Sequence, residues 1–177
     1  IVLTKRGAGS ETETALAGFP HHSLNTYLPK LVKAGLRVAI CDQLEDPSQA
    51  KGIVKRGVTE LVTPGVSYND NVLDLKHNNY LASVHFAADD YMGVAFLDIS
   101  TGEFFTTEGS VAYIDKLIQG FSPAEILYCK KHKQRFEALF GDKYNTYTFD
   151  DWAYSFDFAY NLLTGHFKTN SLKGFGI

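Results

Sequence analysis

Residues 80–107, YLASVHFAADDYMGVAFLDISTGEFFTT, decide the fold of the larger part of the chain. The first part of this stretch alternates apolar and polar side chains, as a strand with one buried face does, and Asp89-Asp90 is typical of a turn. The run 91–100 is mostly apolar, which indicates a strand inside a sheet. Thr101-Gly102 marks another turn, and 103–107 form a third strand. The stretch therefore predicts three consecutive antiparallel strands.

Downstream of these strands, helical and strand patterns alternate. Apolar residues at helical spacing predict helices over 111–121 and 131–140, and short apolar runs predict strands at 125–129 and 144–148. A last helix is expected to begin at a cap formed by Asp150 or Asp151, and to carry Trp152, Phe156, Ala159 and Leu163. The element order βββαβαβα predicts an α/β module with a mixed sheet covered by helices. That order is the one found in ribonuclease-H-like folds.

The preceding residues predict a smaller mixed-sheet α/β module over 1–63, joined by a linker over 64–78 to the larger module, 79–177. The residues after Thr63-Pro64-Gly65 are polar with few candidates for a core. Ser23 or Thr26 can cap a helix that ends near Ala34 with Gly35 as its C′ residue, and Pro29 favours Thr26 because proline fits the first turn. The other expected elements are a strand at 1–4, a loop over 5–18, a strand at 37–43 and a strand or hairpin within 51–63.

The composition is that of a globular protein, and the charge argues against a free-standing DNA-binding domain. Of the 177 residues, 45% are hydrophobic and 21% charged, with a formal net charge of −3. Binding of nucleic acid needs cations for the phosphates, so any such contact must come from a local basic patch. The two cysteines, Cys41 and Cys129, imply no disulfide framework. No apolar run approaches the roughly 20 residues needed to span a membrane.

Neither a catalytic nor a metal site is expected. A ribonuclease-H-like nuclease needs several carboxylates that converge on two metal ions, and the first of them lies in the middle of the first strand. The strand at 80–87 has no acid, although Asp98 and Glu103 lie on the next two strands. His21-His22 has no third ligand at suitable spacing, and no glycine-rich phosphate loop occurs. We therefore expect a non-catalytic piece of a larger intracellular protein, whose two ends both cut into patterned elements.

Small basic clusters occur in the first module, at Lys5-Arg6, Lys51 and Lys55-Arg56. Such clusters form either a solvated surface or a contact to phosphates, which needs only a few cations on one face.

Several phrases of the sequence together resemble the MutS family of bacterial mismatch repair proteins. The first module resembles the mismatch-recognition domain of that family, in Leu3-Thr4-Lys5-Arg6-Gly7, in Ala17-Gly18-Phe19-Pro20-His21-His22, in Val38-Ala39-Ile40-Cys41-Asp42-Gln43 and in Val62-Thr63-Pro64-Gly65. The second module resembles the connector domain, in the segment 97–104 and the closing Leu172-Lys173-Gly174-Phe175-Gly176.

The resemblance implies that the first module supports binding of mismatched double-stranded DNA. By matching position, Arg6, Arg56, Lys5 and Lys51 would contact the DNA backbone. In the family a Phe-x-Glu motif recognises the mispaired base and lies upstream of the Leu-Thr-Lys-Arg segment. A similar pattern with aspartate in place of glutamate, as at Phe149–Asp151, occurs in this chain in the other module.

The resemblance also implies a role for the second module in coupling DNA binding to the ATPase domains and to the partner protein MutL. The contact surface would lie on the helix 151–163 and the loop 165–170, with Trp152, Tyr154, Tyr160 and Asn161 as candidates. The competing interpretation, which we favour from the sequence, is that these aromatic side chains pack the helix onto the sheet.

The longer protein implied by the family is a cytoplasmic, nucleoid-associated homodimer that uses ATP and Mg²⁺, while this part of it needs no cofactor. Two alternatives are a MutS paralogue that acts on branched or recombining DNA and, from another class, a metal-dependent nuclease.

Overall fold

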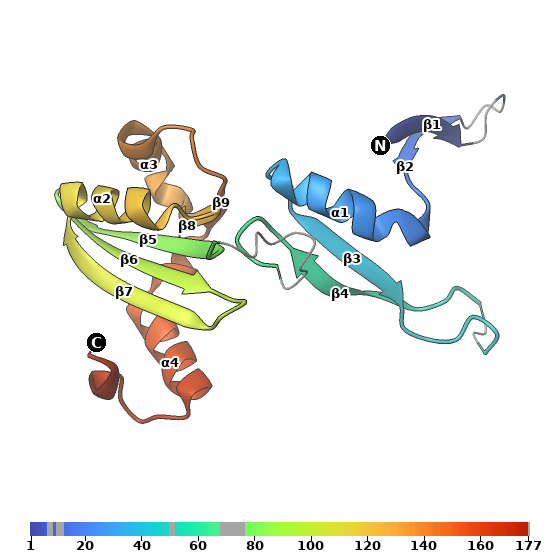
Figure 1. Ribbon diagram of the computed structural model, residues 1–177. Coiled ribbons are helices and arrows are strands. Elements are labelled where there is room, and N and C mark those ends of the chain that lie inside the picture. Colours follow the sequence, from blue (N-terminus) through green and yellow to red (C-terminus); the bar gives the residue numbers. More distant parts are fainter. Residues whose placement is uncertain (7–8, 10–12, 50–51, 68–76, 177) are drawn as a thin grey trace. The chain divides into compact units, whose positions relative to one another are not determined.

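A computed structural model of the protein describes residues 1–6, 9, 13–49, 52–67 and 77–176 (Figure 1). The chain folds as two compact units, Ile1–His77 and Asn78–Ile177. Each unit has a hydrophobic core of its own. None of the helices in the described part of the chain is long and apolar enough to cross a membrane.

The second unit is built on a mixed sheet of five strands. The strands are β5 (Tyr80–Ala88), β6 (Tyr91–Asp98), β7 (Glu103–Ser110), β8 (Glu125–Cys129) and β9 (Thr146–Phe149). Their order across the sheet is β7-β6-β5-β8-β9. The first three strands pair antiparallel, whereas β8 pairs parallel with β5, and β9 parallel with β8. The α/β fold class and the succession of three antiparallel strands and two parallel strands are confirmed.

One face of this sheet carries the core. Helices α2 (Val111–Phe121) and α3 (Lys133–Phe140) cover it, and Figure 1 shows α4 (Phe156–Phe167) on the opposite side of the sheet. The buried cluster consists of Ala82, Val84, Phe86, Met92, Val94, Phe96, Ile114, Ile118, Ile126, Tyr128, Phe136 and Phe140. Alternation along β5 explains the arrangement, because Val84 enters this core while Ser83 and His85 face the other side.

The ends of α2 and α3 follow local chemistry. The Ser110 hydroxyl accepts a hydrogen bond from the backbone N–H of Tyr113 at 3.3 Å and so caps α2. Gly141, with φ of 67°, ends α3 where the sequence predicted. The first turn of the helix predicted over 131–140 is the 3₁₀ turn η2 (Lys130–His132), so the α-helix itself begins later.

The last helix differs from the prediction. A 3₁₀ turn, η3 (Asp151–Tyr154), comes first, and Ser155 then adopts extended backbone (φ −75°, ψ 141°) before α4 begins at Phe156. Neither Asp150 nor Asp151 caps the helix, because Asp150 makes no capping hydrogen bond and the Asp151 carboxylate accepts one from the Cys129 thiol at 2.9 Å. Trp152 therefore lies outside α4.

The described residues of the first unit form two separate two-stranded antiparallel sheets. In one, β1 (Val2–Arg6) pairs with β2 (Thr14–Gly18); in the other, β3 (Val38–Gln43) pairs with β4 (Arg56–Val62). The prediction of a loop over 5–18 is wrong for β2. All five residues of this strand are exposed, so no buried face gives it an alternating pattern.

Helix α1 (Leu24–Lys33) packs on β3 and β4 through Leu28 and Val32, which are buried with Val62. The helix follows the 3₁₀ turn η1 (His21–Ser23) and begins before Thr26, so Thr26 is not its N-cap and Pro29 lies inside it. The proline is tolerated because burial of the apolar face, more than the loss of one backbone hydrogen bond, decides whether the helix forms. Gly35, with φ of 81°, is the C′ residue as predicted.

Candidate nucleic-acid interface and partner surface

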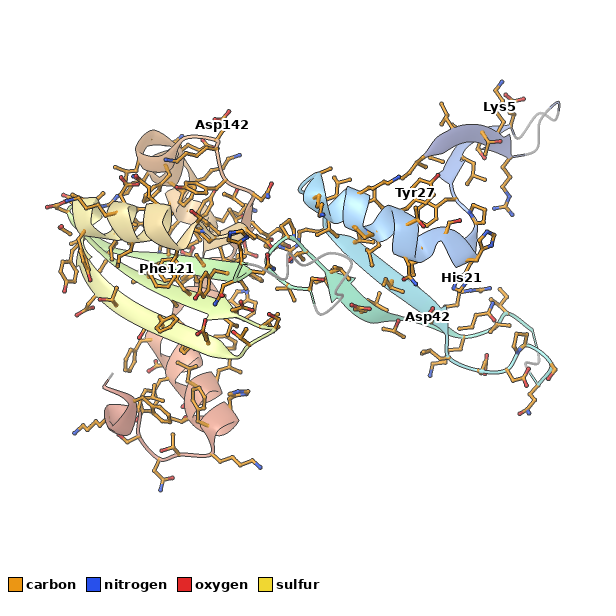
Figure 2. The ribbon with its side chains drawn as sticks, viewed as in Figure 1. Lys5, His21, Tyr27, Asp42, Phe121 and Asp142 are labelled. Atoms are coloured by element: carbon orange, nitrogen blue, oxygen red, sulfur yellow. The ribbon has the colours of Figure 1, made fainter. Side chains whose placement is uncertain are left out.

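Lys5 lies on β1 and is held by an acidic residue of the same hairpin (Figure 2). Its Nζ atom is 2.5 Å from Oε1 of Glu13, and the Glu13 carboxylate also accepts a hydrogen bond from the backbone N–H of Gly9. The interaction with Lys5, helped by the Gly9 amide, lowers the pKa of the Glu13 carboxyl. A phosphate group would therefore have to replace a carboxylate that Lys5 already contacts.

Among the described residues, neither of the two arginines has such an acidic partner. Arg6 ends β1 and Arg56 begins β4, and both side chains are exposed. Within the described residues, no carboxylate lies at ion-pair distance from either guanidinium group. The Arg56 guanidinium donates one hydrogen bond, from Nη1 to the carbonyl oxygen of Val54 at 3.3 Å. Lys51, the fourth cation that the sequence singled out, lies outside the described residues.

His21 and His22 are exposed in η1, at the start of α1 (Figure 2 labels His21). In the parts of the chain that the structure describes, no three His, Cys, Asp or Glu side chains gather in a way that could hold a metal ion.

Asp98 and Glu103, the two acids relevant to a nuclease, are directly opposite each other on β6 and β7 and already have hydrogen-bond partners. Oδ1 of buried Asp98 accepts hydrogen bonds from the backbone N–H and the hydroxyl of Ser100, and Oδ2 accepts one from the N–H of Asn79. Burial raises the pKa of Asp98, but these hydrogen bonds outweigh it, so that the pKa is lowered overall. Glu103 accepts hydrogen bonds from the Tyr80 hydroxyl and from the side-chain amide of Asn78. Both acids therefore have a structural role at this edge of the sheet.

The middle of β5, where a nuclease of this fold would carry its first acid, is covered by an aromatic residue. The Tyr154 hydroxyl lies 3.4 Å from the hydroxyl of Ser83, and the Tyr154 ring stacks on His85 with 6.2 Å between ring centroids. Burial raises the pKa of the Tyr154 phenol. Beside it, burial and the hydrogen bond to Asp151 raise the pKa of the Cys129 thiol, which therefore is not an activated nucleophile. These contacts attach η3 to the sheet.

Most of the aromatic residues from Trp152 onward are exposed, contrary to the interpretation that they pack the last helix onto the sheet. Trp152 is 60% exposed and Phe156 77%, and α4 contains no buried residue. Tyr154 and Tyr160 are half-buried exceptions, and η3 turns Tyr154 onto β5. The exposed set comprises Trp152, Phe156, Phe158, Leu162 and Phe167, which we call the α4 surface.

The side chains of the α4 surface contact one another and their neighbours. Trp152 and Phe158 meet edge to face with 4.9 Å between centroids, and Phe156 stacks on Tyr160 at 5.6 Å. The Tyr160 hydroxyl donates to the carbonyl oxygen of Asn170 at 3.4 Å, which joins the helix to the following loop. Asn161 is exposed on the same helix. Four residues were predicted from the sequence for the partner surface. Trp152, Tyr160 and Asn161 lie on or beside the α4 surface, whereas Tyr154 contacts the sheet.

Sequence reasoning missed the break at Ser155, and with it the separation of Tyr154 from α4. The sequence does carry a signal for it, because serine followed two residues later by aspartate is typical of a helix start. Asp150 and Asp151, which are also favourable cap residues, led to the prediction of an earlier helix start.

The sequence comparisons agree with this division into two units. Residues 1–71 match the family described as MutS domain I, and residues 79–177 match the family described as MutS domain II. The protein named DNA mismatch repair protein MutS from Cytophaga hutchinsonii is 67% identical over all 177 residues of this chain, which cover 21% of that relative. Proteins of the same name from Flavobacterium psychrophilum and Flavobacterium johnsoniae are 68% and 66% identical, each covered to 20% of its length. The chain thus spans about a fifth of the length of these relatives.

Proposed function

The chain belongs to the MutS family, and from this membership we propose that it forms part of a sensor of mismatched DNA. Its first unit supports binding of the mismatched duplex, and its second unit, as the connector, couples that binding to the rest of the longer protein and to MutL. The observation that carries the proposal is the match of two successive segments to MutS domains I and II, in that order. The longer protein is then a homodimeric, DNA-dependent ATPase that uses Mg²⁺ and acts on bacterial DNA in the cytoplasm.

In this proposal the cations of the first unit contact phosphates and position the duplex without reading its sequence. Arg6 and Arg56 are the main contacts, because both guanidinium groups are exposed and no described carboxylate pairs with them. Lys5 contributes less, since Glu13 already neutralises it. Lys51 keeps the same proposed role. Contacts of this kind stabilise a bent duplex.

The experiment on these contacts measures binding of the longer protein to mismatched and matched duplexes over a range of salt concentrations. Arg6→Ala and Arg56→Ala should each weaken binding to both duplexes by a similar factor. Each should also reduce the slope of log K against log salt by about one, because one fewer counterion is released. Lys116→Ala, which removes an exposed cation of α2, is the control and should leave the slope unchanged. An unaltered slope in both arginine variants would contradict phosphate contact.

The α4 surface supports the second half of the proposal, contact with MutL. Large exposed apolar patches mark interaction sites in soluble proteins, and this one includes Trp152 and Phe156. Trp152→Ala and Tyr160→Ala in the longer protein should weaken binding of MutL by roughly tenfold or more, as loss of an aromatic anchor does. Tyr113→Ala, at an exposed tyrosine of α2, should not. If all three variants bind MutL as tightly as the wild type does, the α4 surface does not contact MutL.

The two alternative functions receive less support. The relatives reported above carry the name of a mismatch repair protein, which favours mismatched over branched or recombining DNA as the ligand. A nuclease would need Asp98 as a metal ligand, but its oxygens already accept hydrogen bonds from Ser100 and Asn79.

A further inference from the structure

The α4 surface ends, at the C-terminal end of its helix, in a pair of aromatic rings. Phe167 of α4 contacts Phe175 of the 3₁₀ turn η4 (Lys173–Phe175) with 5.0 Å between ring centroids, and both side chains are exposed. Phe156 and Tyr160 lie on the same side of the helix as Phe167, because residues at spacings of four and seven follow one another along one face. This face of α4 therefore runs from Phe156 to the pair of rings.

Two lysines lie next to the pair of rings. Lys168 directly follows Phe167, and Lys173 lies in the same 3₁₀ turn as Phe175. Both lysines are exposed, and among the described residues no carboxylate lies at ion-pair distance from either ammonium group. We call these four residues, Phe167, Lys168, Lys173 and Phe175, the α4 end.

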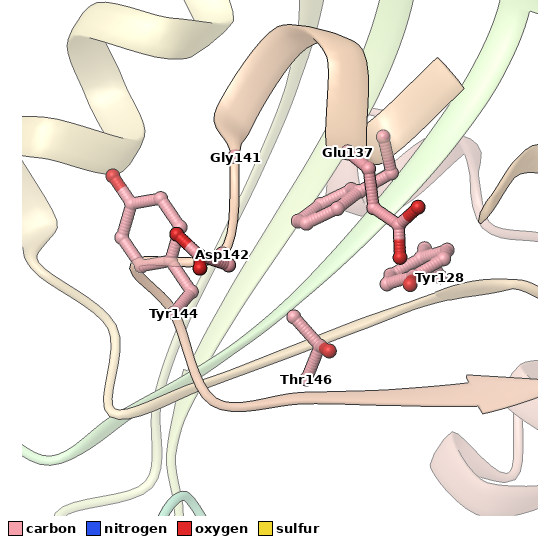
Figure 3. A pocket seen from close by; sticks show the side chains of 7 residues that line it. Tyr128, Glu137, Gly141, Asp142, Tyr144 and Thr146 are labelled. Carbon is pink, nitrogen blue, oxygen red and sulfur yellow. The ribbon is translucent and has the colours of Figure 1, made fainter. Parts of the chain in front are cut away.

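The α4 end is positively charged, although the second unit as a whole has more acidic than basic residues. Asp157, in the first turn of α4, is the last aspartate or glutamate of the sequence. Other acids of the unit lie elsewhere: Glu137 and Asp142 line a pocket of about 400 Å³ beside α3 (Figure 3). Helix α3 covers the opposite face of the sheet from α4. The described part of the chain thus leaves the charge of the α4 end without a counter-charge.

The backbone of Lys168 is independent evidence that its side chain is used. Lys168 is the C-cap of α4 and adopts the left-handed conformation (φ 52°, ψ 44°), which costs glycine less than lysine. Ser122 also has a positive φ, but its hydroxyl donates a hydrogen bond to the carbonyl oxygen of Gln119 at 2.9 Å and so stabilises its turn. The Lys168 side chain makes no such hydrogen bond to a described residue. A lysine where glycine is the more stable residue points to a contact outside this chain.

We propose that the α4 end binds an acidic, apolar segment of a partner protein. Carboxylates of that segment pair with Lys168 and Lys173, and its apolar side chains cover Phe167 and Phe175. A protein fits better than a nucleic acid, because binding of phosphates needs more cations than these two and the unit around them is acidic. The identity of the partner as MutL rests on the proposed function, whereas the acidic and apolar character of the segment rests on the α4 end itself.

The first test titrates the 177-residue chain with two short peptides that share the same leucines, one with glutamate and the other with lysine at the remaining positions. NMR follows the backbone amide signals of the chain. The glutamate peptide should shift the signals of Phe167, Lys168 and Phe175, with a Kd on the order of 1 mM. The lysine peptide should bind about tenfold more weakly or worse, and a single-stranded thymidine oligonucleotide should cause no shift at these residues. Equal binding of the two peptides, or shifts at the α4 end with the oligonucleotide alone, would overturn the proposal.

Substitution of Lys168 separates a role in binding from a role in stability. Lys168→Gly should weaken binding of the glutamate peptide roughly twofold to fivefold, as loss of one exposed ion pair does. The same change should not lower the midpoint of denaturant unfolding, because glycine adopts the left-handed conformation readily. Lys173→Gln should weaken binding by a similar factor, while Lys116→Gln, at an exposed lysine of α2, is the matched control and should not. If Lys168→Gly leaves binding unchanged, Lys168 serves only the negative end of the helix dipole and the proposal is wrong.

Binding of MutL to the longer protein separates this inference from the proposed function. Reversal of both charges, by Lys168→Glu together with Lys173→Glu, should weaken MutL binding by roughly tenfold or more, since like charges then face each other. If Trp152→Ala and Tyr160→Ala weaken MutL binding but the double charge reversal does not, the α4 surface contacts MutL and the inference about an acidic segment is wrong. If none of these variants affects MutL binding while the glutamate peptide binds as expected, the proposed contact with MutL is wrong and the α4 end takes an acidic segment of another protein.

Discussion

Asp98 remains ionised although its side chain is fully buried. A buried carboxylate without partners would take up a proton, since burial raises its pKa. Here the Ser100 hydroxyl and the N–H groups of Asn79, Ser100 and Thr101 donate to it and lower the pKa below its usual value. The folded state therefore binds the proton less tightly than the unfolded chain does, and ionisation of Asp98 stabilises the fold.

Substitution of this residue should destabilise the second unit. Asp98→Asn places an amide N–H against a backbone N–H donor, so we expect the free energy of unfolding at pH 7 to fall by about 1–3 kcal/mol. The difference from the wild type should be fully present above the unfolded pKa, near 4, and should shrink as the pH falls through the lower folded pKa. Denaturant titrations between pH 7 and pH 3 measure it, with Asp90→Asn as the control. A difference independent of pH would contradict this role of the charge, and metal-dependent cleavage of nucleic acid that is lost in Asp98→Asn would revive the nuclease alternative.

The elements that the sequence predicted best are those whose local chemistry and burial agree. Helix α2 has a serine cap at Ser110 and buries Ile114 and Ile118 at helical spacing, and its predicted and observed bounds are the same. Strand β5 alternates, as its one buried face requires. By contrast, β2 is exposed throughout and forms only because β1 pairs with it, which no local pattern announces.

The cations of the first unit and the α4 surface could likewise be predicted from the sequence only in part. The sequence indicated the exposed guanidinium groups of Arg6 and Arg56, but the pairing of Lys5 with Glu13 depends on the hairpin that was not predicted. The aromatic residues of α4 were expected in the core because aromatic side chains usually are buried. Their exposure depends on where η3 directs the helix, and that is set by contacts to β5 and β8.

Tyr154 should control how firmly α4 is held. Since α4 buries no residue, η3 provides its attachment through Tyr154 on β5 and Asp151 on Cys129. Tyr154→Ala should therefore accelerate amide hydrogen exchange in α4 by roughly tenfold and leave exchange in α2 unchanged. Phe156→Ala, at a residue that is 77% exposed, serves as the comparison and should have little effect on exchange in either helix. Equal protection of α4 in Tyr154→Ala and the wild type would show that other contacts hold the helix.

At the scale of the whole molecule, the described chain carries two kinds of surface. The first unit offers exposed arginines but no Phe-x-Glu motif, and the second offers the α4 surface. In the proposed function the chain supports the duplex and contacts partner proteins, while recognition of the mispaired base belongs to another part of the longer protein.

Binding of the 177-residue chain and of the longer protein to mismatched and matched duplexes, compared at one salt concentration, tests this central claim most directly. The 177-residue chain should bind both duplexes weakly and with affinities that agree within about a factor of two, because phosphate contacts do not distinguish them. The longer protein should prefer the mismatched duplex by about tenfold or more, which corresponds to about 1.4 kcal/mol. A similar preference by the 177-residue chain alone would contradict the account, since it would place the mismatch-reading residues within this chain.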